Sequence, residues 1–123
     1  MEKSKVYFTD FRTHPGGDAI PKKLQRLIKE AGIGNIDFNG KLVAIKMHFG
    51  ELGNIAFLRP NYAKAVVDVI KELGGKPFLT DCNTLYPGSR KNALEHSLAV
   101  AAFEVASHKL VVVDTLVQQV ART

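Results

Sequence analysis

The sequence predicts an α/β fold of three layers (α/β/α), built on a mainly parallel four-stranded sheet with elements in the order β-α-β-α-β-α-β. The first observation is that short apolar runs alternate along the chain with segments whose apolar residues recur every three or four positions. The second is that glycine, proline and asparagine stand between the two kinds of segment. With 46% hydrophobic residues in a chain of 123, we expect a single domain over residues 1–123 with its own core.

The first strand is expected at residues 6–8 (Val-Tyr-Phe), a short run of residues that favour strands. A polar loop with paired glycines follows, and the first helix comes after it. This helix has Asp18 as a candidate cap, Pro21 near its first turn and Gly32 as its stop. Its apolar positions lie at helical spacing: Leu24, Leu27, Ile28 and Ala31.

The second strand is expected at residues 42–45, after the turn residues Asn39 and Gly40. Because this run is apolar throughout, it is typical of a strand covered on both faces. The second helix begins at Pro60 and ends before Gly74. Its apolar stripe consists of Ala63, Val66, Val67, Ile70 and Leu73.

The third strand is expected at residues 77–80, the third helix from near Ser89, and the fourth strand at residues 110–113. The remaining tail could form one more short helix. The inner face of the third helix consists of Ala93, Leu94, Leu98, Ala101 and Ala102.

Polar residues follow the apolar runs of all four expected strands: Asp10, His48, Asp81 and Asp114. A parallel sheet brings the carboxyl ends of its strands to one edge, which is where ligands bind in open α/β sheets. The alternative is that the acids cap the following helices or begin turns. For Asp81 the two readings stay open, because a dense row of hydrogen-bonding side chains follows it.

The loop after the second strand contains the candidate catalytic residues His48 and Glu51. A histidine titrates near neutral pH and can carry a proton, and a nearby carboxylate can orient it or act as a base. The alternative is a histidine that only makes structural hydrogen bonds. No ligand spacing typical of a metal site is present, so no metal is assigned, and a metal held by a set of His48, Glu51 and Asp81 stays open as an alternative.

Cations stand at the start of each expected helix, where the helix dipole disfavours them: Lys22 and Lys23, Arg59, and Arg90 with Lys91. An anion bound at this edge of the sheet would reverse the penalty, and a guanidinium can bind a carboxylate or phosphate through two hydrogen bonds. The alternative is that the arginines pair with acids such as Glu51 or Asp81. The candidate ligand-binding residues are Asn54, Arg59, Asp81, Asn83, Thr84, Tyr86, Ser89 and Arg90.

Several of these segments together resemble the amino-terminal part of a known family, the domain-of-unknown-function family numbered 362. The resemblance can be followed over residues 3–96, and residues 97–123 depart from it, so the chain is expected to be a truncated version of a longer domain. The segments that carry the resemblance are residues 5–8, residues 40–51 with Asn54, Leu58-Arg59-Pro60, Phe78-Leu79-Thr80-Asp81, Asn83-Thr84-Leu85-Tyr86, Ser89-Arg90 and Asn92-Ala93.

The family implies an α/β domain of unassigned activity with two signature loops, over residues 48–51 and 81–90. Its members are commonly described as iron–sulfur or ferredoxin-like proteins, because many have a cysteine-rich ferredoxin module later in the chain. The single Cys82 cannot hold a cluster, so no cofactor is carried over.

Three functions stay open. In the first, the domain is the substrate part of a redox or proton-transfer enzyme that acts on a small anion with a ferredoxin-type partner. In the second, it is a non-catalytic module or truncated fragment that binds an electron-transfer partner. In the third, it is a structural fragment. The net charge of +5 favours anionic partners, but nucleic acid is disfavoured because aromatic residues do not alternate with the cations. No apolar stretch is long enough to span a membrane, so we expect a soluble protein. The lone Cys82 excludes an internal disulfide, so we expect a reducing, cytoplasmic setting. An exposed sheet edge would favour a homo-oligomer.

Overall fold

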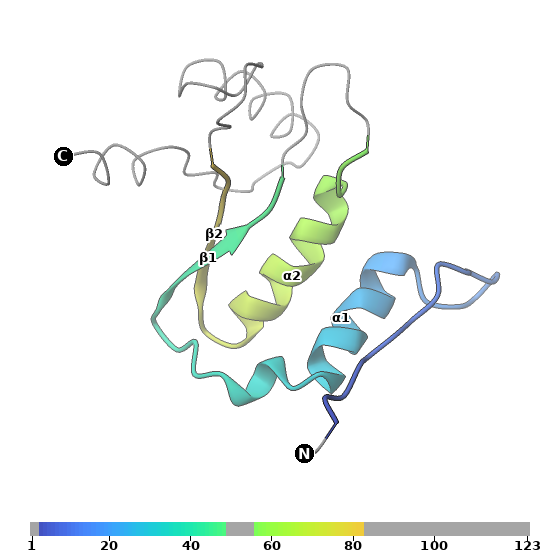
Figure 1. Ribbon diagram of the computed structural model, residues 1–123, viewed down its shortest axis with the longest axis horizontal. Helices are drawn as coiled ribbons and strands as arrows, with labels where there is room; N and C mark the ends of the chain where they lie inside the picture. The colour runs from blue at the N-terminus through green and yellow to red at the C-terminus, as the bar shows by residue number, and fades with distance from the viewer. Residues whose placement is uncertain (1–2, 49–55, 83–123) are drawn as a thin grey trace.

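The structure is a computed structural model, and it describes residues 3–48 and 56–82 of the chain. This part contains two helices, a short 3₁₀ helix and a two-stranded parallel sheet (Figure 1). It confirms an α/β unit with a parallel sheet. The third helix and the strand at residues 110–113 lie outside the described residues, so the four-stranded, three-layer arrangement stays a prediction.

Helix α1 spans Ile20–Glu30, close to the predicted bounds. Pro21 lies in its first turn, and Gly32 adopts a left-handed conformation (φ 95°) after its end, as expected for a helix stop. The prediction that Asp18 caps α1 is wrong. The capping position is Ala19, and the Asp18 carboxylate pairs instead with the Arg26 guanidinium in the second turn of the helix.

Strands β1 (Leu42–Lys46) and β2 (Lys76–Thr80) pair in parallel, with Leu42 opposite Lys76 and Lys46 opposite Thr80. The pairing extends one step further, because the backbone N–H of Met47 donates to the carbonyl of Thr80 at 3.0 Å. The two strands therefore end side by side.

Helix α2 (Pro60–Glu72) covers one face of this sheet. The core cluster joins Ala63 and Val67 of α2 to Leu79 of β2, and Ile45, Met47 and Phe57 pack against it. Helix α1 packs against α2, so the sheet, α2 and α1 lie in that order across Figure 1. Neither helix in the described part of the chain is long and apolar enough to cross a membrane.

The prediction that β1 is covered on both faces is not met by the part of the chain that the structure describes. Val43 and Ile45 are half-buried on the side of α2, whereas Leu42, Ala44 and Lys46 are exposed. Leu42 is 77% exposed. The alternation is typical of a strand with a single packed face.

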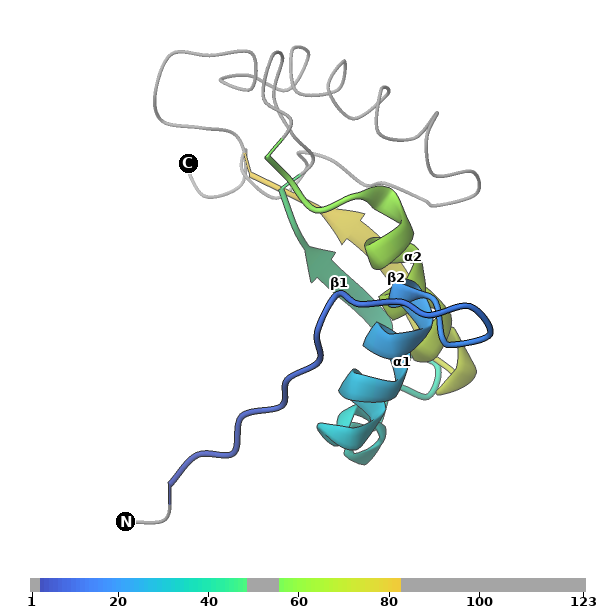
Figure 2. The ribbon, with the colours of Figure 1, turned by 90° about the vertical axis from the view of Figure 1, so that its right-hand side faces the viewer.

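The prediction of a strand at residues 6–8 is wrong. These residues form no strand, and Val6 and Phe8 are 89% and 84% exposed. Figure 2 shows the segment running away from the sheet. The reason is that the following residues are held against α1 by Lys23, whose ammonium binds the Asp10 carboxylate and the Arg12 carbonyl. That attachment leads the chain along the outer side of α1 rather than to an edge of the sheet.

Candidate functional site

The strands end and α2 begins at the same end of the structure (Figure 1). We call this end the carboxyl rim. It consists of the last residue of β1 and the two residues after it (46–48), the last residue of β2 and the two after it (80–82), and the first residue of α2 with the three before it (57–60). His48, Arg59 and Asp81 all belong to it. The topology thus places Arg59 and Asp81 at one end of the unit, as the sequence predicted.

Asp81 lies on the carboxyl rim with a side chain only 6% exposed. A buried carboxylate requires hydrogen bonds and an opposite charge. The backbone N–H of Cys82 donates to Asp81 Oδ1 at 2.8 Å, and Lys46 Nζ lies 3.5 Å from the same oxygen. Lys46 was not among the predicted site residues. The signal that could have revealed it is a lysine that ends an otherwise apolar strand just before a polar loop.

Arg59 occupies the N-cap position of α2, directly before Pro60. Its side chain caps no backbone N–H, and the first turn of α2 contains no acidic residue. Within residues 3–48 and 56–82, no carboxylate forms an ion pair with its guanidinium. Arg59 is exposed, so it presents a positive charge at the positive end of a helix dipole.

His48 lies on the carboxyl rim two residues after β1, with an exposed side chain. Its predicted neighbour Glu51 falls outside the described residues, so the spacing of the two is not tested. The same holds for the other predicted site residues in the loops: Asn54, Asn83, Thr84, Tyr86, Ser89 and Arg90.

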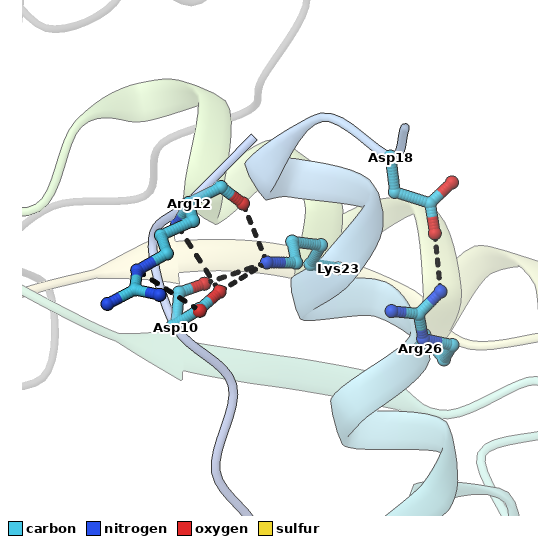
Figure 3. Close-up of polar contacts among 5 residues, drawn as sticks. All are labelled: Asp10, Arg12, Asp18, Lys23 and Arg26. Atoms are coloured by element: carbon cyan, nitrogen blue, oxygen red, sulfur yellow. Dashed lines mark hydrogen bonds and ion pairs between the residues drawn. The ribbon is translucent and has the colours of Figure 1, made fainter. Parts of the chain in front are cut away.

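A second polar cluster lies at the start of α1 (Figure 3). Lys23 is only 15% exposed, and its ammonium donates to the Asp10 carboxylate at 2.6 Å, the Asp10 carbonyl at 3.1 Å and the Arg12 carbonyl at 2.8 Å. Three acceptors match the three N–H groups of an ammonium. Contacts within the protein therefore account for the position of this lysine without a bound anion.

The loop at residues 10–12 also reaches the first turn of α2. The ring of Phe11 meets that of Tyr62 edge to face, with centroids 6.4 Å apart. Aromatic pairs favour this geometry. The loop after the expected first strand thus lies beside the amino termini of both helices, although no strand precedes it.

The Asp10 contact predicts a dependence of stability on pH. The hydrogen bond from Lys23 is the main reason that the pKa of the Asp10 carboxyl is lowered. A carboxyl with a lowered folded-state pKa stabilises the fold above its unfolded pKa, and this contribution is lost as the pH falls through the folded value. We expect Asp10→Asn to lower the melting temperature at neutral pH, and the two proteins to converge in acid.

Thermal unfolding monitored by circular dichroism across this pH range measures the effect. Asp68→Asn is the matched control, because Asp68 forms an exposed pair with Lys64 one turn away on α2. A difference between wild type and Asp10→Asn that stays constant into acid would contradict the assignment.

Among the residues that the structure describes, no three His, Cys, Asp or Glu side chains gather in a way that could hold a metal ion. What the carboxyl rim offers is two cations, Lys46 and Arg59, together with a histidine and a buried carboxylate. Such groups can bind an oxyanion and exchange a proton with it.

The family described as DUF362, a domain of unknown function, matches residues 43–120. The match includes β1 from its second residue, α2 and β2, hence the whole carboxyl rim. It also extends past residue 96, where the resemblance found in the sequence ends. No curated protein and no solved structure matches the chain.

Proposed function

The chain belongs to the DUF362 family of domains of unknown function, and we propose that it binds a small anionic molecule at its carboxyl rim. Arg59 is the main anion-binding residue. The remaining contacts come from loop residues that the sequence singles out: Asn54, Asn83, Thr84, Tyr86, Ser89 and Arg90. Asp81 orients a polar group of the site.

The observation that carries this proposal is the position of Arg59. A cation at a helix N-terminus destabilises the helix by about 0.3–1 kcal/mol. Neither a cap by its side chain nor an acid in the first turn of α2 offsets this cost. A bound anion would offset the cost, because it would interact with both the guanidinium and the backbone N–H groups of the first turn.

As an enzyme, the domain would be the substrate part of a redox or proton-transfer reaction. His48 and Glu51 would move protons on the bound anion, and a ferredoxin-type partner would supply electrons. The single cysteine, Cys82, is consistent with a reducing, cytoplasmic setting. Residues 89–102 and 110–113 would add a helix and a strand to the described unit.

The test is the stabilisation of the protein by inorganic phosphate, measured as the melting temperature at constant ionic strength. A ligand that binds only the folded state raises the free energy of unfolding by RT ln(1 + L/Kd), where L is its free concentration and Kd its dissociation constant. The melting temperature therefore rises with the phosphate concentration. We expect Arg59→Gln to abolish the rise. Without phosphate the variant should be as stable as the wild type, or more stable by roughly 0.3–1 kcal/mol, because an unfavourable dipole interaction is removed.

Lys71→Gln is the matched control. Lys71 lies in the last turn of the same helix, where the dipole favours a cation. This variant should be slightly less stable than the wild type and should keep its full response to phosphate. An equal response of wild type and Arg59→Gln would refute the proposal, and would favour a module that binds a protein partner through its basic surface.

A further inference from the structure

Lys46 is held at the end of the sheet rather than extended freely into solvent. It is the last residue of β1, at a position where the alternation of the strand turns its side chain away from α2. Its neighbours Ile45 and Met47 pack in the core. Yet its ammonium lies 3.5 Å from Asp81 Oδ1, beyond the end of the neighbouring strand. The lysine side chain therefore reaches across the carboxyl rim from β1 to β2.

The two partners of this ion pair differ in exposure. The Asp81 side chain is 6% exposed and the Lys46 side chain 63% exposed. The carboxylate is further fixed by the backbone N–H of Cys82, at 2.8 Å. One end of the pair is thus anchored in the protein, and the other faces solvent.

The ammonium of Lys46 keeps hydrogen-bonding capacity for a further acceptor. A separation of 3.5 Å is longer than the roughly 2.7–2.9 Å of a strong charge-assisted hydrogen bond. An ammonium has three N–H donors. Lys23 contrasts with it, since its ammonium is 15% exposed and has three oxygen acceptors within the protein.

We propose that Lys46 is a second anion-binding residue of the carboxyl rim, and that the buried Asp81 carboxylate anchors its ammonium there. This inference rests on the proposed function and assigns a residue that the sequence did not suggest. With Arg59 at the start of α2 and Lys46 at the end of β1, the site offers cations from two different elements. An oxyanion is the ligand that fits this proposal, because its several oxygens can accept hydrogen bonds from more than one cation.

The test compares dissociation constants for inorganic phosphate, obtained from melting temperatures at constant ionic strength. Lys46→Met should weaken phosphate binding about tenfold, the effect of losing one hydrogen bond to a charged group. Lys46→Arg, which keeps the charge, should bind phosphate within about threefold of the wild type. Lys76→Met is the control, because Lys76 is an exposed lysine at the opposite end of β2 and should leave binding unchanged.

A second measurement uses the unaltered protein. Bound phosphate should slow the acylation of Lys46 by an amine-reactive reagent, followed by mass spectrometry, and should leave Lys76 unaffected. Wild-type binding of phosphate that is lost in Arg59→Gln but kept in Lys46→Met, with no protection of Lys46, would overturn this inference and leave the proposed function standing. A wild type that does not respond to phosphate at all would overturn both.

Discussion

Replacing Leu79 by alanine is expected to lower the free energy of unfolding by about 2–5 kcal/mol. Leu79 of β2 is 0% exposed, and its side chain packs against Ala63 and Val67 of α2. Truncation removes buried methyl groups and leaves a cavity that a packed cluster fills only in part. Urea unfolding at 25 °C, followed by circular dichroism, measures the loss.

Leu42→Ala is the matched control, because it makes the same chemical change on β1 at a side chain that is 77% exposed. Its effect should stay within about 0.5 kcal/mol, as for most surface substitutions. A cost at Leu79 no greater than the cost at Leu42 would mean that α2 does not pack on β2 in this way. Because Met47 and Phe57 of the carboxyl rim pack against the same cluster, Leu79→Ala should also weaken phosphate binding.

Gly75→Ala is expected to destabilise the protein by about 1–3 kcal/mol, the usual cost of overpacking a core. An added Cβ would lie 2.6 Å from Ile70 Cγ2 and 3.2 Å from both the Ile70 carbonyl oxygen and Phe38 Cβ. Ile70 is 3% exposed, so its side chain has little room to move. The strain falls where the chain turns from α2 into β2.

Gly34→Ala serves as the comparison, since an added Cβ there meets no atom within 4 Å. Alanine restricts the unfolded chain more than glycine, so this variant should be neutral or slightly stabilising. Urea unfolding of both variants checks the pair. Equal stability of Gly75→Ala and Gly34→Ala would rule out the close approach of the turn to α2.

The elements that the sequence predicted correctly are those with strong periodicity and clear ends. Helices α1 and α2 each have an apolar stripe and a proline in the first turn. Each is followed by a glycine in the left-handed conformation, Gly32 after α1 and Gly74 after α2. The segment at residues 6–8 has residues that favour strands but no strand partner in the described part of the chain. Strand pairing is a tertiary property, and here the attachment of Asp10 and Arg12 to Lys23 decides the path of the chain.

The site was predictable to the extent that it follows from topology. Parallel strands end at one edge, so His48 and Asp81 could be placed together from the order of the elements alone. The pairing of Asp81 with Lys46 could not be predicted in this way. The Lys46 side chain projects from the exposed face of β1, and only its length and flexibility let it reach the end of β2. Likewise, the pairing of Lys23 depends on a loop that folds back onto α1, which no local pattern encodes.

Binding of an oxyanion at the carboxyl rim can be observed residue by residue in a phosphate titration followed by amide NMR at constant ionic strength. We expect saturable shifts with one shared dissociation constant at Met47, His48, Asn61 and Cys82, and no such shifts after the end of α1, at residues 32–35, on the opposite end of the described unit (Figure 1). Shifts that do not saturate, or that are as large at residues 32–35 as at the carboxyl rim, would contradict it.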